Sequence, residues 1–365
     1  MARLGDFFAL IRNGANIKQG LDDSGYPITR IETISNRTVD RNKMGYAGIN
    51  DLSKYRDYVL QDGDILMSHI NSEKHLAKTA LYQKNDREEV IHGMNLLLLR
   101  PNTDCVISKY AFYYFSSQSF LRQIPNITKK SVNQASFTVS ALKELSFPSV
   151  PLNEQLKIVG VLEKIDTLIE MRKQQLAKLD ELVKARFVEM FGDVITNTQS
   201  WETYTWADVL SVKNGRNQKN VENPNGQYPI CGSGGVMGYA DDYITKENSV
   251  IIGRKGNINK PILMREKYWN VDTAFGLEPK PDVLLVDYLY LYCILFDFEI
   301  LNKAVTIPSL TKADLLKIDM PIPPIDLQNQ FAAFVEQVDK SKFAVQKALD
   351  ESQTLFDSLM QQYFG

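Results

Sequence analysis

The chain has 365 residues, enough for two domains of about 150 residues and a connection between them. Its composition, with 44% hydrophobic and 24% charged residues, is typical of a folded globular protein and excludes a mostly disordered or collagen-like chain. The net charge of −2 gives no general attraction for nucleic acid, so binding of that kind would have to come from local basic patches.

Cysteine usage and hydropathy indicate the compartment. Cys105, Cys231 and Cys293 are widely separated and form no C-x-x-C pair, which favours free thiols over a disulfide framework or a thiolate metal site. The apolar runs are shorter than the ~20 residues of a membrane helix, and residues 1–10 lack the apolar core of a signal peptide. We expect a cytoplasmic protein with no membrane partner.

Residues 1–150 are predicted to form a mixed α/β domain. Apolar stretches at 63–67 and 96–99, bounded by Gly, Asn and Asp, predict short strands, and the aromatic stretch 109–115 predicts a buried helix. This segment has 19 Lys and Arg against 15 Asp and Glu, so it is the basic part of the chain.

Residues 151–192 are predicted to form a long helical region. Between 152 and 190, seam positions recur at alternating steps of four and three, as in a coiled coil. Pro148 and Pro151 lie just before this helix, Asn153 is its expected N-cap, and Gly192 suits its C-cap. The seam residues predicted to pair with another helix are Ile158, Leu162, Ile165, Leu176 and Leu179, with Arg172 and Arg186 as polar members.

Residues 193–323 are predicted to form a second mixed α/β domain, with strands at 250–252 and 261–264 and a buried helix within 287–298. Residues 324–365 then repeat the helical region, with a helix over 325–363 and Asp326 as its expected N-cap. Its seam includes Val338, Val345, Leu349 and Phe356, with Lys342 and Ser352 as polar members.

The chain is an internal duplication at an offset of 173 residues. Leu142, Pro148, Pro151 and Gln155 correspond to Leu315, Pro321, Pro324 and Gln328, and Phe191-Gly192 corresponds to Phe364-Gly365. The front parts match more loosely, since Tyr26-Pro27-Ile28 recurs as Tyr228-Pro229-Ile230. We therefore expect two domains of one architecture with different surfaces.

Neither long helix can bury its seam alone, so the two are expected to pair. An antiparallel pair is favoured because the chain passes through a domain between them. The alternative is an ordinary helical hairpin within a core, but charged residues flank a narrow apolar stripe, which favours the coiled coil. The expected fold class is a duplicated α/β (α+β) architecture, with two similar domains separated by two long antiparallel coiled-coil helices in pseudo-twofold symmetry.

No catalytic or metal constellation is recognisable. His69, His75 and His92 have no zinc-ligand spacing, and Gly232-Ser233-Gly234-Gly235 fits a turn better than a phosphate-binding loop. Because no nucleophile motif or Walker motif occurs, we expect a protein that is not an enzyme.

Two polar loops at corresponding places are the candidate binding elements. Glycine-flanked cations can approach phosphates, and Arg, Lys and Asn side chains can read base edges. An ordinary exposed loop has a similar composition, so each loop alone is weak evidence. The candidate DNA-binding residues are Arg254, Lys255, Asn257, Asn259 and Lys260 in the second half, His69, Asn71, Lys74 and Lys78 in the first, and Lys129, Lys130 and Lys303.

The sequence resembles the specificity (S) subunit of type I restriction-modification systems over essentially its whole length. The duplicated joint Pro151-Leu152-Asn153-Glu154-Gln155 is similar to that family's Pro-Leu-x-Glu-Gln run before the long helix, as is the segment from Tyr228 to Gly256. In the second joint, Leu327 replaces the usual glutamate before Gln328. The acid itself is therefore not expected to be essential.

The resemblance implies a non-catalytic subunit that binds double-stranded DNA. Residues 1–150 and 193–323 would be target-recognition domains that each read half of a bipartite target. Regions 151–192 and 324–365 would set the gap and dock two modification (M) methyltransferase subunits, alongside restriction (R) subunits. The chain itself would hold no cofactor, because S-adenosylmethionine, ATP and Mg would belong to the partner subunits.

Two alternatives stay open at this point. One is the specificity subunit of a related type II system with fused modification and restriction functions. The other is a two-domain scaffold that binds a protein or glycan rather than DNA.

Overall fold

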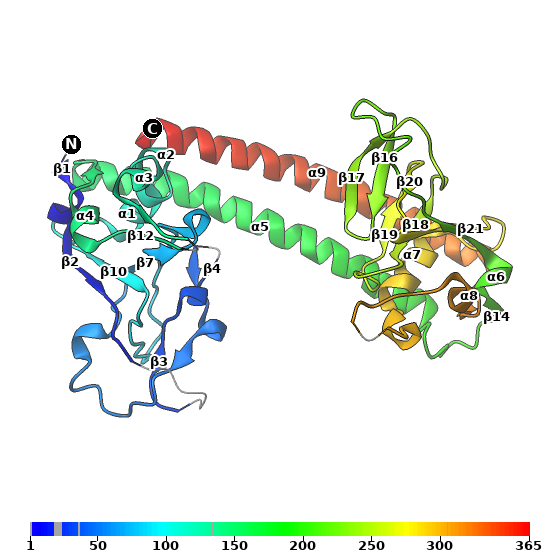
Figure 1. The fold of residues 1–365 in the computed structure, drawn as a ribbon, viewed down its shortest axis with the longest axis horizontal. Coiled ribbons are helices and arrows are strands. Elements are labelled where there is room, and N and C mark those ends of the chain that lie inside the picture. Colours follow the sequence, from blue (N-terminus) through cyan, green and yellow to red (C-terminus); the bar gives the residue numbers. More distant parts are fainter. Residues whose placement is uncertain (1, 18–23, 36, 133, 305) are drawn as a thin grey trace. The chain divides into compact units, whose positions relative to one another are not determined.

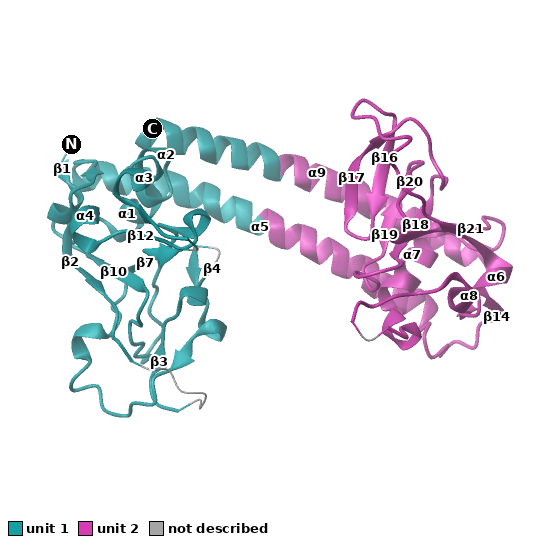
Figure 2. Cartoon of the chain, in the orientation of Figure 1, with its two compact units in different colours: residues 1–171, 349–365 teal, residues 172–348 magenta. Residues whose placement is uncertain are grey.

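The computed structural model describes residues 2–17, 24–35, 37–132, 134–304 and 306–365. It divides into two compact units, unit 1 with residues 1–171 and 349–365, and unit 2 with residues 172–348 (Figure 2). Each unit contains one mixed α/β front part together with the beginning of one long helix and the end of the other (Figure 1).

Unit 1 is built on a six-stranded sheet with the order β2-β10-β7-β9-β5-β4. Its strands are β2 (Phe8–Asn13), β4 (Ile34–Ser35), β5 (Thr38–Val39), β7 (Ile65–Ser68), β9 (Thr79–Leu81) and β10 (Leu96–Pro101). Smaller sheets join β1 (Ala2–Arg3) to β13 (Ser146–Phe147), β3 (Pro27–Ile28) to β6 (Gly45–Tyr46), and β8 (Ile70–Asn71) to β12 (Ala135–Ser136) and β11 (Lys129–Lys130). The short helices are α1 (Ser108–Phe115), α2 (Gln118–Leu121), α3 (Ile124–Ile127) and α4 (Val139–Lys143).

Unit 2 repeats this plan with fewer strands. Its main sheet has the order β15-β21-β18-β19, which corresponds to β2-β10-β7-β9 of unit 1. These strands are β15 (Leu210–Asn214), β18 (Ser249–Gly253), β19 (Ile262–Met264) and β21 (Ala274–Pro279). The remaining strands are β14 (Thr203–Thr205), β16 (Tyr228–Gly232), β17 (Gly235–Ala240), β20 (Trp269–Asn270) and β22 (Asp319–Pro321), and the short helices are α6 (Trp206–Val209), α7 (Val286–Leu295) and α8 (Lys312–Leu315).

The two long helices are α5 (Leu152–Phe191) and α9 (Ile325–Phe364), each of 40 residues. In unit 2 they are antiparallel: Arg172 donates to the carbonyl of Ala348, Lys342 pairs with Asp180 at 2.5 Å, and Arg186 lies over the ring of Phe334. Leu162 and Ile165 are buried with Phe356 in the core of unit 1, and Val338 is buried in that of unit 2. Five further seam residues, Ile158, Leu176, Leu179, Val345 and Leu349, are partly buried.

The duplicated α/β fold with two long helices is confirmed, but the expected N-caps are wrong. The helices begin at Leu152 and Ile325, so Asn153 and Asp326 lie inside the first turn. Pro151 and Pro324 precede the helices, and their carbonyls accept the first helical hydrogen bonds. A proline fits there because its fixed φ suits a helix start and its missing N–H costs nothing at that position.

A buried glutamine fastens each long helix to its front part. The Gln155 amide accepts from the Ile107 amide at 2.9 Å and donates to the carbonyls of Cys105 and Val150 at 2.9 and 2.7 Å. In unit 2, Gln328 accepts from Leu285 at 2.9 Å and donates to Val283 and Pro323, each at 2.9 Å. Both glutamines are fully buried, so the same three bonds fix the start of the helix relative to α1 or α7.

The end of the other helix completes each core. Phe364 at the end of α9 packs against Tyr110 of α1 in unit 1, with ring centroids 5.2 Å apart. Phe191 at the end of α5 packs against Tyr288 of α7 in unit 2 at 5.0 Å. The aromatic helices predicted at 109–115 and within 287–298 are therefore core elements that receive the repeated Phe-Gly ends.

Candidate functional site

The basic segments of unit 1 meet in a small three-stranded sheet. Strand β8, which follows β7 directly, pairs Asn71 with Ala135 of β12, and β12 pairs in turn with β11. Lys129 and Lys130 form β11, so only β12 lies between them and Asn71 in the sheet. In sequence, these lysines are almost sixty residues from Asn71. Lys130 also pairs with Glu73 at 2.7 Å. Two patches that looked separate in the sequence form one surface.

Unit 2 makes the corresponding contact with its basic loop. The loop after β18 bridges Lys255 to Ser309, and the Leu310 amide donates to the Arg254 carbonyl at 2.9 Å. Ser309 corresponds to Ser136 of β12 in the duplication. Lys303 precedes this segment, and its ammonium group pairs with Asp314 at 2.8 Å. The same backbone arrangement thus presents different side chains in the two units.

The loop of unit 2 is tightly closed on itself. Ile258 is 1% exposed and anchors the loop, while Lys255, Asn257 and Lys260 are exposed. A Cβ on Gly253 would meet the Asn257 carbonyl oxygen at 2.4 Å, so only glycine permits this close approach. These constraints fix the backbone from which the exposed cations project.

Two of the predicted residues of this loop are partly engaged inside the protein. The Asn259 amide donates to Asp297 at 2.8 Å and accepts from the Phe298 amide at 2.7 Å. The Arg254 guanidinium lies 5.8 Å from the centre of the Phe275 ring. Asn259 therefore holds the loop against the segment after α7, and a base contact by its side chain would require both of these bonds to break.

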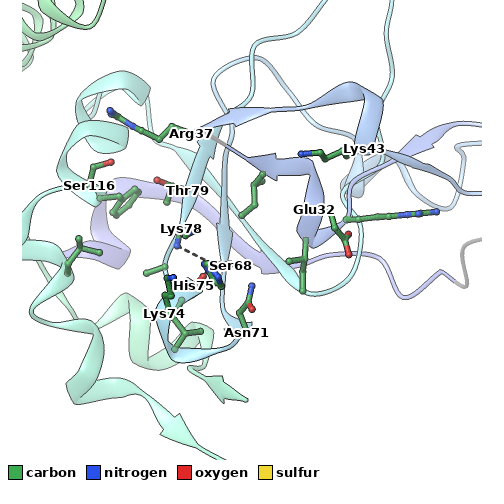
Figure 3. Close-up of a pocket in the computed structure, with 17 residues that line it drawn as sticks. Glu32, Arg37, Lys43, Ser68, Asn71, Lys74, His75, Lys78, Thr79 and Ser116 are labelled. Carbon is green, nitrogen blue, oxygen red and sulfur yellow. Dashed lines mark hydrogen bonds between the residues drawn. The ribbon is translucent and has the colours of Figure 1, made fainter. Parts of the chain in front are cut away.

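A basic cavity in unit 1 collects more cations than the sequence pattern indicates. It has a volume of about 1090 Å³ and is lined by the predicted residues Asn71, Lys74 and Lys78 (Figure 3). Arg30, Arg37 and Lys43 also line it, with Glu32 as its acidic residue, while Ile34, Leu76 and Phe115 are among its apolar lining residues. A concave surface with this balance of cations suits a polyanion with an apolar component.

Arg30, Arg37 and Lys43 were missed because they lie on a segment that unit 2 does not have. After Tyr228-Pro229-Ile230, strand β16 turns into β17 at residues 233–234, which confirms the turn predicted at the glycines. After Tyr26-Pro27-Ile28, residues 29–44 separate β3 from β6; we call residues 29–44 the insertion. Its strands β4 and β5 extend the main sheet and its cations line the cavity. The sequence signal that could have revealed the insertion was the greater length of chain that follows Tyr-Pro-Ile in the first half than in the second.

His69 lies beneath this surface rather than on it. Its side chain is 7% exposed, and burial lowers the pKa of His69 to about 4. The ring faces Phe137 with centroids 6.3 Å apart. His69 is therefore neutral at pH 7 and cannot neutralise a phosphate there. Of the three histidines, His92 is also buried, and burial lowers its pKa to about 3.

Within the described residues, no group of three or more His, Cys, Asp or Glu side chains is arranged to hold a metal ion. Burial raises the pKa of the Cys231 thiol to about 12. None of the helices in the described ranges is long and apolar enough to cross a membrane.

Comparisons with known proteins identify the family of the chain. The model of the type I restriction modification DNA specificity domain matches residues 1–181 and again residues 198–352. The MjaX specificity subunit of a type I restriction enzyme from Methanocaldococcus jannaschii is 32% identical, over 94% of this chain and 89% of that protein. The chain belongs to the type I restriction-modification DNA specificity family.

Structural comparison gives the same architecture for this specificity protein. The S subunit of the type I system of M. genitalium matches with a TM-score of 0.64 and 19% identity, over 100% of this chain and 95% of that one. A chain from a structure on complex assembly and conformational transition of a type I R-M system matches with a TM-score of 0.57 and 17% identity, over 100% and 96%. At these identities the matches support the fold.

The family assignment gives the function at a coarse level. The specificity protein carries two recognition domains, one for each half of the duplication, and belongs to a subunit family that is not itself catalytic. Such a subunit acts with DNA and with partner subunits. The two halves share the order of four strands in the main sheet and differ in the insertion, which only unit 1 contains within the described residues.

Proposed function

We propose that each front part, residues 1–150 and residues 193–323, reads one half of a bipartite DNA target. The observation that carries this proposal is the match of the specificity-domain family to both halves of an internally duplicated chain. Both halves share a strand order but differ in the insertion and in the polar loops. One scaffold with two different surfaces suits two different half-sites.

The reading surface of unit 1 is the basic cavity together with the β8, β12 and β11 sheet. Lys74 and Lys78 are exposed on the cavity wall, and Lys129 is exposed on the outer strand of the sheet. In unit 2 the surface is the loop with Arg254, Lys255, Asn257 and Lys260, supported by Asn259 and flanked by Lys303. Cations of this kind position the phosphate backbone, and the amide of Asn257 is placed to read a base edge.

The helical regions, residues 151–192 and 324–365, set the gap between half-sites and dock two methyltransferase (M) subunits. Exposed apolar residues on the helices support a docking role, including Leu168 and Met171 on α5 and Phe343 on α9, the last 75% exposed. Restriction (R) subunits complete the complex. S-adenosylmethionine, ATP and Mg would serve the partner subunits, which would carry out methylation and cleavage in the cytoplasm.

Methylation mapping tests the function as a whole. A host that carries the gene together with its modification subunits is compared with the same host lacking only this gene. We expect methylation of one bipartite motif, with two defined halves and a fixed undefined gap, to depend on the gene. An unchanged methylome, or a motif without a gap, would contradict the proposal.

Charge removal tests the reading loop of unit 2. Arg254, Lys255 and Lys260 are replaced together by alanine in the full chain assembled with its M subunits. If all three contact phosphates, the slope of log affinity against log salt concentration falls by up to about three, since each phosphate contact contributes ~0.9. The control replaces Lys246, Lys267 and Lys317 of the same unit by alanine, which changes net charge equally at positions outside the loop sequence. Equal slopes in both variants would place the DNA elsewhere.

A further inference from the structure

Arg37 occupies an unusual position at the turn of the insertion. It lies between β4 and β5, on the segment of unit 1 that has no equivalent in unit 2. Its backbone adopts a φ of 64°, in the left-handed region that residues with a side chain rarely adopt. The turn therefore holds this side chain in one direction at a conformational cost.

The side chain reaches away from the insertion to three helices of the same unit. The guanidinium carbon lies 4.9 Å from the ring centre of Phe112 on α1 and 5.9 Å from that of Phe356 on α9. One guanidinium nitrogen lies 3.8 Å from a carboxylate oxygen of Asp166 on α5. Asp166 is itself held by the hydroxyl of Tyr113, which donates to it at 2.9 Å. Arg37 thus connects the insertion to both long helices.

This contact is not an ordinary packing solution. The Nε and Nη2 atoms of Arg37 are buried, and no described residue accepts a hydrogen bond from either. A left-handed backbone and two unpaired buried donors both disfavour this arrangement, and such features concentrate at functional sites. An apolar side chain would pack against Phe112 and Phe356 without leaving donors unpaired. The retained charge therefore indicates a role in addition to packing.

Arg37 also lines two cavities. It lines the basic cavity of about 1090 Å³ together with Arg30, Lys43, Lys74 and Lys78. It lines a second cavity of about 210 Å³ together with Glu163 and Asp166 of α5. One wall of the basic cavity, the insertion, is therefore fastened to the long helices by this side chain.

We infer that Arg37 is a positioning residue for DNA recognition by unit 1. It fixes the insertion against α5 and α9, and through the insertion it fixes the distance between Arg30 and Lys43 on one wall of the cavity and Lys74 and Lys78 on the other. This inference rests on the proposed function. Sequence discrimination requires side chains held at defined positions, whereas attraction between cations and phosphates tolerates movement.

The test replaces Arg37 by glycine, because glycine adopts a φ of 64° without strain and the turn is preserved. A matched control is Arg87→Gly, since Arg87 has a φ of 63° in the same unit and an exposed side chain. Arg37→Lys keeps the charge near Asp166 but loses the planar group that lies over Phe112. Each variant is made in the full chain assembled with its M subunits, and affinity is measured for the cognate duplex and for duplexes altered in either half-site.

We expect Arg37→Gly to lower discrimination about tenfold in one half-site and to leave the other half-site and the salt slope unchanged. Arg37→Lys should be intermediate, and Arg87→Gly should match the parent chain. A salt slope reduced by about one would make Arg37 a phosphate contact and overturn the inference. Equal loss in both half-sites, or no difference from Arg87→Gly, would also overturn it. If the parent complex does not discriminate between sequences at all, the proposed function fails instead.

Discussion

Gln155 and Gln328 perform the same task in the two units, although different residues surround them. Each side chain is fully buried and satisfies three backbone groups next to the start of a long helix. Replacing Gln155 by leucine would keep much of the volume but leave the Ile107 amide and the Cys105 and Val150 carbonyls without these partners. We expect the free energy of unfolding of unit 1 to fall by about 3 kcal/mol, because each buried unpaired group costs about 1 kcal/mol or more.

Denaturant unfolding of the full chain, followed through its first transition, measures this loss. Glu154→Ala is the control. Glu154 is next to Gln155 in the sequence, and its ion pair is with Lys157, an exposed residue. A surface pair of this kind contributes at most about 1 kcal/mol. If the two variants are equally stable, the glutamine is not the residue that holds the joint. The second joint has Leu327 at the position of Glu154 but keeps the glutamine as Gln328, which agrees with a larger effect of the glutamine than of the glutamate.

A carboxylate in unit 1 predicts how stability changes in acid. Hydrogen bonds from Arg41 hold the pKa of Glu88 at about 2, well below its usual range. The pKa in the folded state is depressed, so this stabilisation is complete above the unfolded pKa of ~4.3 and is lost as pH falls towards 2. We expect Glu88→Gln to remove this part of the pH dependence, as measured by thermal unfolding between pH 5 and 2. A parallel pH profile for the variant would contradict the pairing.

The sequence predicted the positions of the glutamines through the duplication but not what they bind. Two of the three partners of each glutamine lie 43 to 50 residues upstream, and nothing in the spacing indicates which backbone groups the side chain satisfies. Arg30, Arg37 and Lys43 of the cavity were missed for a related reason. The duplication points to residues that both halves share, whereas these residues lie on the insertion, which only the first half possesses among the described residues.

At the scale of elements, the long helices were the most predictable part of the fold. A heptad seam is a local pattern, and the observed helices differ from the predicted ranges by one residue at their ends. The strands at 63–67, 96–99, 250–252 and 261–264 were also recognisable from apolar runs. The joining of β8 to β12 was not, because a two-residue strand has no periodicity from which to read its partner.

The helix pair predicts a difference between apolar and polar seam positions. Ile165→Asp or Val338→Asp would bury a charge in a core, so we expect a loss of several kcal/mol in stability together with loss of the M complex. Arg172→Leu removes a bond to the Ala348 carbonyl but buries no charge, so it should be tolerated better. Denaturant unfolding and co-purification of the M subunits check both effects. Equal loss in the apolar and polar sets would refute helix pairing through this seam.

At the scale of the molecule, the duplication separates two tasks. The elements shared by both halves are the main sheet, the aromatic helix and the glutamine joint, and these provide stability. The elements that differ are the insertion, the β16–β17 turn and the polar loops, which are the proposed readers. Recognition can therefore change in one half without repacking the core. The shared core makes the two readers recognisable from the sequence, whereas the bases they select depend on the parts that differ.

If the helices set the gap between the half-sites, a change in helix length must match both the distance between the half-sites and their relative rotation about the duplex axis. One heptad inserted into each helix, after residues 171 and 348, adds about 10 Å and keeps the seams facing each other. About three base pairs have that length, but they rotate the second half-site by roughly 100° about the duplex axis. We therefore expect the complex with one added heptad to bind every gap length more than tenfold more weakly than the parent complex binds its own target.

Three heptads in each helix should restore binding. They add about 31 Å, which is close to the length of nine base pairs and nearly a full turn of DNA. The second half-site is then displaced by the added helix length and faces nearly the same direction as in the parent target. Affinity is measured on a set of duplexes that keep both half-sites and vary the gap one base pair at a time. We expect the preferred gap to lengthen by about nine base pairs with tight binding regained. A preferred gap that stays unchanged in either variant would show that the spacing is set outside α5 and α9.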